Sequence, residues 1–163
     1  MTVAGSNSCV LRLIAGEADS EAAVAAYRHA GRPVLPYLWV HQLEVENALR
    51  QRAFHESQVR PAVERRRIRE DLDAAFTRLG QLLRRRGLTR VAMDLDAVVA
   101  RSLQLSADHT QRLGARAIEV LHVAAALHLG AGQFLTFDRR QSKIARAEGL
   151  EVLDLPEERR TRT

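Results

Sequence analysis

The sequence predicts an α/β domain with a central, mostly parallel sheet flanked by helices. Short apolar segments alternate with helical patterns along the whole chain, which is typical of parallel strands joined by helical crossovers. Gly130, Gly132 and Gly149 mark the short connections that such folds use. The chain has 163 residues and is 46% hydrophobic, which is enough for one compact core. We therefore expect a single domain over residues 1–155 and a polar tail over 156–163.

The first half of the chain is expected to hold two strands and four helices. Their expected positions are a strand at 2–4, a helix at 8–15, a helix from Asp19 to Gly31, a strand at 33–36, and helices at 39–57 and 61–86. Pro36 should end its strand, since proline cannot donate to a sheet ladder. Gly87 should cap the helix before it. The apolar residues that we assign to the inner surface of helix 39–57 are Trp39, Leu43, Leu49 and Ala53.

The second half continues the alternation. Its expected elements are an extended segment at 88–92, helices at 94–105, 106–113 and 116–129, a strand at 133–137, a helix at 139–148 and a strand at 150–153. The helix at 116–129 is apolar nearly all round and should be buried. The strand at 133–137 also reads as buried from its composition.

Charge and cysteine content narrow the class of protein. The net charge is +5, and Lys143 is the only lysine, so almost all positive charge is arginine. Arginine suits phosphate groups, so a nucleic-acid partner is reasonable, although arginine richness from codon composition explains the same numbers. The arginine runs at 65–67 and 84–86 are expected to be solvated helix faces. A single cysteine, Cys9, and the lack of a long apolar run or basic leader predict a cytoplasmic protein without a membrane segment.

Three carboxylates are candidates for chemistry, and each also has a structural explanation. Asp138 follows a strand and opens a helix, so it lies at the functional edge of an α/β sheet, but with Gln141 it also matches a helix capping box. Glu119 lies in the first turn of the apolar helix, where the helix dipole stabilises an acid. Periodicity does not decide whether Glu44 is buried. If the three carboxylates converge, a divalent cation is needed to offset their repulsion.

Three blocks of sequence resemble the PIN-domain ribonucleases, specifically the VapC-type toxins of toxin–antitoxin pairs. The blocks are residues 43–49 with Glu44, residues 116–127 with Glu119, and residues 130–138 with Asp138. The resemblance implies a PIN-like fold and assigns Glu44, Glu119 and Asp138 as catalytic, metal-binding acids. It also implies Mg²⁺ or Mn²⁺ as cofactor, RNA as substrate, a cognate antitoxin as partner and a homodimer.

The chain departs from the family pattern at two positions. Glu119 stands where the family usually has aspartate. The first acid of the family should fall at Gly5 or Ser6, and neither side chain is a carboxylate. Arg139 and Arg140, beside Asp138, are the candidates for contacts with RNA phosphates, and a packed histidine is favoured over a general base for His122.

The expected function is therefore a metal-dependent endoribonuclease toxin whose activity is impaired by loss of the first acid. A non-catalytic PIN-fold module that binds antitoxin or RNA without cleavage is the alternative. A nuclease that acts on DNA is a third interpretation.

Overall fold

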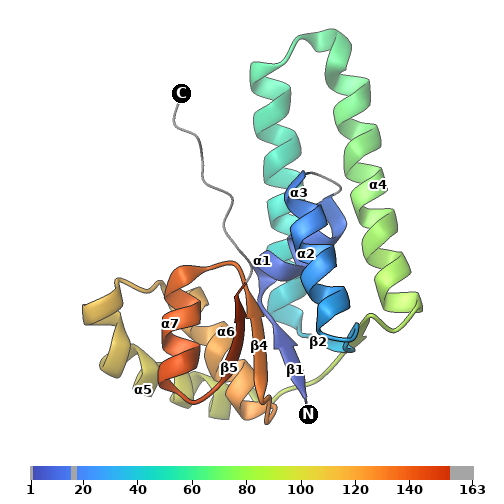
Figure 1. The fold of residues 1–163 in the computed structure, drawn as a ribbon. Coiled ribbons are helices and arrows are strands. Elements are labelled where there is room, and N and C mark those ends of the chain that lie inside the picture. The colour runs from blue at the N-terminus through green and yellow to red at the C-terminus, as the bar shows by residue number, and fades with distance from the viewer. Residues whose placement is uncertain (1, 16–17, 155–163) are drawn as a thin grey trace.

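In the part of the chain that the structure describes, five strands form two small sheets, and every pair of neighbouring strands is parallel. The computed structural model describes residues 2–15 and 18–154, and the predicted polar tail lies outside them. The strands β1 (Val3–Gly5), β4 (Gln133–Thr136) and β5 (Glu151–Asp154) form a three-stranded sheet in the order β1-β4-β5. The strands β2 (Leu35–Tyr37) and β3 (Leu88–Arg90) form a separate pair. The predicted α/β class with parallel strands is confirmed (Figure 1).

The break between the two sheets falls beside Pro36, which lies inside β2 and does not end it as we expected. Leu35 donates its N–H to Gly87, and Tyr37 accepts from Val91, so these two residues face β3. In a parallel strand the backbone groups of the intervening residue face the opposite edge. Pro36 therefore turns its donor-free nitrogen toward the β1 side, where a ladder bond would be needed. The strands β1 and β2 pack together without pairing.

Helices cover both faces of the strands. One group comprises α1 (Asn7–Ala15), α2 (Ala18–His29), α3 (Trp39–Val59), the 3₁₀ turn η1 (Ala62–Glu64) and α4 (Arg65–Arg84). The other group comprises α5 (Leu95–Leu113), α6 (Ala117–His128) and α7 (Arg139–Ala147). Neighbouring strand residues belong to different cores: Val3 and Leu135 pack with the first group, whereas Ala4 and Phe134 pack with the second. Figure 1 shows the two groups on opposite sides of β1 and β4.

The inner surface of α3 differs from our assignment. Trp39 is 51% exposed and Leu43 is 62% exposed, whereas Val45 and Leu49 are buried. Positions 39 and 43 lie two residues from the buried stripe at 41, 45 and 49, and two residues turn a helix by roughly 200°. The two large apolar side chains therefore face outward, and only Leu49 of the four predicted residues is buried.

Two further expectations about helices need correction. Residues 95–113 form one continuous helix, because the buried stripe of Val98, Leu105 and His109 continues past the predicted break. The turn after α4 is made by Arg86, whose φ is 57°, and not by Gly87. Gly87 is needed for space instead, since a Cβ there would lie 3.3 Å from the Tyr27 hydroxyl. Within the described residues, no helix has the length and apolar character needed to cross a membrane.

Candidate functional site

Polar side chains gather where β1 and β4 end. Ser6 follows β1 directly, and Asp138 lies two residues beyond the end of β4, at the start of α7. Because the strands are parallel, their carboxyl ends meet at one edge, which is where functional sites of α/β sheets lie. Ser6 donates its backbone N–H to Leu135, which ties the end of β1 to the end of β4.

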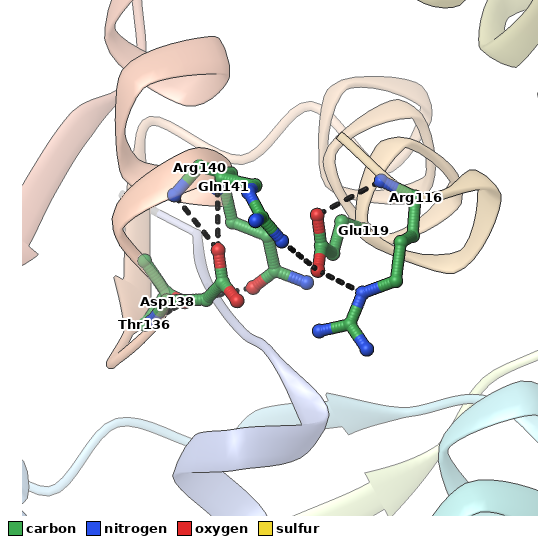
Figure 2. A network of polar contacts seen from close by, with 6 residues as sticks. All are labelled: Arg116, Glu119, Thr136, Asp138, Arg140 and Gln141. Carbon is green, nitrogen blue, oxygen red and sulfur yellow. Dashed lines mark hydrogen bonds and ion pairs between the residues drawn. The ribbon is translucent and has the colours of Figure 1, made fainter. Parts of the chain in front are cut away.

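Asp138 is the N-cap of α7. Its Oδ1 accepts hydrogen bonds from the backbone N–H groups of Arg140 at 2.8 Å and Gln141 at 3.0 Å. The capping interpretation of Asp138 is confirmed. In a capping box the Gln141 side chain would accept the backbone N–H of Asp138, but here that N–H donates to Thr136. The Thr136 hydroxyl donates to Gln141 Oε1 at 2.7 Å and accepts the Asp138 N–H at 3.0 Å (Figure 2). Thr136 and Gln141 thus fix the carboxylate of Asp138 at the end of the sheet.

Glu119 is buried, with only 4% of its side chain exposed, and two arginines neutralise it. Its carboxylate accepts from the backbone N–H of Arg116 at 2.9 Å and from Arg116 Nε at 2.7 Å. Arg140 Nη1 lies 3.7 Å from the same carboxylate (Figure 2). The partner that a buried acid requires is therefore present.

Glu119 and Asp138 act on the same guanidinium. The hydrogen bond that Arg116 donates to Glu119 and the negative charge of Glu119 raise the pKa of Arg116, and the charge of Asp138 adds to them. Arg140 also links the two acids, since its backbone binds Asp138 and its side chain reaches Glu119. These contacts join the two carboxylates into one network (Figure 2).

Gly5 and Ser6, the two candidates for the first-acid position, face different surroundings. A Cβ at Gly5 would lie 3.3 Å from Leu35 and 3.9 Å from Cys9, inside the apolar core. Ser6 instead places its hydroxyl 2.7 Å from that of Ser8 and 3.2 Å from that of Thr136, which contacts Asp138. Ser6 therefore belongs to the polar network, and Gly5 does not.

Glu44 is held in a separate group by His122. Glu44 Oε2 contacts His122 Nε2, and His122 is buried with its Nδ1 unpaired among the described residues. His122 stacks on His41, with 4.7 Å between ring centroids and 8° between planes. Burial lowers the pKa of His41 to about 3, with a smaller contribution from His122, so His41 is neutral. The prediction that His122 is a packed, hydrogen-bonded histidine is confirmed.

The three candidate acids do not form the shared cluster that we expected. Among residues 2–15 and 18–154, no three acidic, histidine or cysteine side chains are grouped so that they could hold a metal ion. Glu119 and Asp138 share a network, but the guanidinium of Arg140 lies between them, and Glu44 is turned to His122. Arginine thus supplies the positive charge that offsets Glu119, and His122 is the hydrogen-bond partner of Glu44.

Sequence reasoning missed the residues that support the acids. Arg116 stands three residues before Glu119, a spacing at which helical side chains meet, so this pair was detectable. Thr136 and His41 gave no local signal, because their partners Ser6 and His122 are far away in sequence. Arg139 and Arg140 are both exposed beside Asp138, where they were predicted.

Comparison with known proteins identifies the fold. No protein-family model and no curated protein matches the sequence. The structure is similar to a chain in the crystal structure of VapBC2 from Rickettsia felis bound to a DNA fragment from their promoter. The TM-score is 0.60 at 11% identity, and the match covers 96% of this chain and 100% of that chain. The chain has a PIN-like α/β fold. The PIN-like fold predicted from the three sequence blocks is thereby confirmed.

Proposed function

We propose that this PIN-like chain is a metal-dependent endoribonuclease toxin of a cytoplasmic toxin–antitoxin pair, with a cleavage site weakened by Ser6. One observation carries the proposal: Ser6, Asp138 and Glu119 lie around the joined carboxyl ends of β1 and β4. The similar solved structure is a VapBC2 complex, which supports an antitoxin as partner. The homodimer that the sequence resemblance implies is part of the same proposal.

The network contains oxygen donors of the type that binds Mg²⁺ or Mn²⁺, and a bound ion would require the paired acids to rearrange. Both ions prefer carboxylate and neutral oxygen ligands, and Mg²⁺ is commonly held by one or two carboxylates while keeping several waters. Asp138 and Glu119 would hold the ion, and Glu44 would join them as the third acid after leaving His122. Beside Ser6, Asn7 Oδ1 is buried and has no hydrogen-bond partner among the described residues, so an uncommitted oxygen is present. A bound ion would supply an activated water and positive charge for the scissile phosphate.

The arginines beside the acids can exchange partners. Arg140 is 48% exposed in its side chain and lies 3.7 Å from Glu119, so this ion pair is loose. A phosphate group can take over the guanidinium of Arg140, because arginine forms strong paired bonds with phosphate. Arg139 is exposed on the adjacent position and can contact the next phosphate. Release of Arg140 would remove one of the two guanidinium contacts of Glu119, so that only Arg116 would still have to be displaced by a cation.

The alternative is a PIN-fold module that binds antitoxin or RNA without cleaving. The observation that favours it is the pairing of Glu119 with Arg116 at 2.7 Å, which occupies a carboxylate that the metal would need. Ser6 adds to this, since a hydroxyl carries no charge to attract a divalent cation.

A cleavage assay on RNA separates the two functions. Wild type, Ser6→Asp and the double variant Ser6→Asp/Asp138→Asn are incubated with total RNA and Mn²⁺, with EDTA as the blank. The proposal predicts weak, EDTA-sensitive cleavage by the wild type. Ser6→Asp should cleave roughly a hundredfold faster, the size of effect that a single preorganised electrostatic group can have.

The double variant is the control for contaminating nuclease. Asn caps a helix about as well as Asp, so Asp138→Asn should keep the fold and remove the activity. If neither wild type nor Ser6→Asp cleaves any RNA, the non-catalytic alternative is correct. Duplex DNA added to the same reactions tests the third interpretation, since a DNA nuclease would cleave the DNA in preference to the RNA.

A further inference from the structure

Two segments of the sequence contain arginine but no acidic residue. No Asp or Glu occurs at positions 22–43 or 74–93. The first segment carries Arg28 and Arg32, and the second ends with the run Arg84, Arg85 and Arg86 before Arg90. Elsewhere on α3 and α4 the arginines alternate with acids, so these segments differ from the rest of the same helical hairpin.

The fold brings the two segments together. The Leu35 N–H donates to the Gly87 carbonyl at 3.0 Å, and a Cβ on Gly87 would touch the Tyr27 hydroxyl. The backbone N–H of Arg32 donates to the Tyr27 carbonyl at 2.9 Å. The end of α2 and the end of α4 therefore lie side by side where β2 and β3 begin (Figure 1). This is the end at which the strands begin, whereas Ser6 and Asp138 lie beyond the ends of β1 and β4.

The five arginines at this end of the strands are exposed and have no acidic partner among the described residues. We call them the arginine surface: Arg28, Arg32, Arg84, Arg85 and Arg86. No ion pair joins any of them to an acid in the part of the chain that the structure describes. Arg60, Arg66 and Arg67 on the same hairpin are different, because each pairs with an acid four residues later.

Helix capping does not account for the arginine run. The last carbonyls of α4 accept from backbone N–H groups: Gln81 from Arg85, Leu83 from Arg86 and Leu82 from Gly87. The guanidinium groups are therefore not used to close the helix end. An open hollow of about 360 Å³ adjoins the run and is lined by Arg86, Arg90, Thr89, Leu83 and Leu88. It adds one further guanidinium, that of Arg90, and the hydroxyl of Thr89 to the groups that a ligand could contact.

We propose that the arginine surface binds the phosphate backbone of double-stranded nucleic acid, independently of its sequence and of the cleavage site. Clustered, unpaired arginine is the pattern that neutralises several phosphates and releases their counterions. A single strand would need exposed aromatic rings for its bases. Tyr27 and Phe76 do not offer them here, since Tyr27 bonds to Pro33 and Arg50 covers Phe76. Trp39 is exposed, but it lies beyond the opposite end of β2.

Binding is tested with fluorescently labelled 24-base-pair duplexes in EDTA, so that no cleavage contributes. The variant R84Q/R85Q/R86Q removes three charges of the arginine surface and keeps unbranched, polar side chains. The matched control R60Q/R66Q/R67Q removes three paired charges from the same hairpin. Anisotropy at 50 to 200 mM salt gives Kd and its salt dependence, and circular dichroism shows that both variants fold.

The first variant should bind about 10- to 100-fold more weakly at 50 mM salt, and the slope of log Kd against log salt should fall by about 2 to 3. The control variant should stay within about threefold of wild type. RNA and DNA duplexes run in parallel identify the source of the phosphate. Equal losses in both variants, no duplex binding by wild type, or equally tight binding of a single strand or of polyglutamate would each overturn the proposal.

Discussion

Asp138 serves the fold and the proposed chemistry through different properties of its carboxylate. Its Oδ1 caps α7, a role that needs an acceptor oxygen but no charge, whereas metal binding needs the negative charge. Asp138→Asn should therefore leave the melting temperature within about 1 °C. Asp138→Ala should lower the melting temperature by about 2–4 °C, from loss of about 1 kcal/mol of capping. Thermal unfolding followed by circular dichroism measures both, and equal losses would contradict this separation of roles.

The contrast between Gly5 and Ser6 gives a second test at the residue scale. An aspartate at Gly5 would direct its carboxylate at Leu35 and Cys9, in the core. An unpaired buried charge costs about 3 kcal/mol or more, so Gly5→Asp should melt roughly 6–12 °C lower than wild type. An aspartate at Ser6 would meet the hydroxyls of Ser8 and Thr136 and should cost much less. A Ser6→Asp protein that unfolds at lower temperature than Gly5→Asp would refute our placement of the first acid.

Single residues were predictable where the signal was local. The capping role of Asp138 followed from its position before a helix, and the Arg116–Glu119 contact could have been read from a spacing of three. Glu44 could not be assigned from periodicity, because its partner His122 is on another helix, 78 residues later. Ser6 and Gly5 were indistinguishable until the direction of each side chain was known.

At the scale of elements, the end of α4 carries a measurable cost. Arg86 adopts φ 57°, a left-handed conformation that glycine reaches without strain. Arg86→Gly should raise the unfolding free energy by about 1 kcal/mol and the melting temperature by roughly 2–4 °C. Gly87→Ala should have the opposite effect, because a Cβ there would meet Leu82 at 3.2 Å. Chemical denaturation of the two variants measures these changes, and a less stable Arg86→Gly would contradict the assigned turn.

Element types were easier to predict than the directions they face. Alternating apolar segments and glycine turns identified the strands and most helices, since these signals are local. Trp39 and Leu43 were placed inward because they are large and apolar, yet the stripe at Val45 and Leu49 decides which side of α3 is buried. The position of Pro36 inside β2 was also missed, because proline is tolerated where the neighbouring edge is unpaired.

For the whole molecule, buried His41 links stability to pH. Its pKa is about 3 in the folded protein and about 6.5 when unfolded, so the unfolded chain takes up a proton that the folded chain does not. The contribution of His41 is complete above pH 6.5 and falls by about 1.4 kcal/mol per pH unit toward pH 3. Between pH 8 and pH 5, wild type should therefore lose about 2 kcal/mol more unfolding free energy than His41→Phe. Urea unfolding at both pH values measures this.

The control for that measurement is His128, which is exposed at the end of α6. His128→Gln should retain the pH dependence of wild type. If His41→Phe shows the same loss with pH as wild type, His41 is not the residue that couples protonation to folding.

The overall architecture was predictable, whereas the state of the site was not. The order of strands and helices follows from hydrophobic periodicity, and the PIN-like fold bears out the three sequence blocks. The pairing of Glu119 with Arg116 and Arg140, and of Glu44 with His122, depends on contacts between helices that the sequence does not encode locally. Those contacts decide whether the acids are available to a cation.

The most direct test of a weakened ribonuclease site is the ratio of Mn²⁺-dependent RNA cleavage rates for Ser6→Asp and wild type, measured side by side. Our account predicts a ratio of roughly a hundred, lost when EDTA is added or when Asp138 is also changed to Asn. A ratio near one, or cleavage that persists in EDTA, would contradict it.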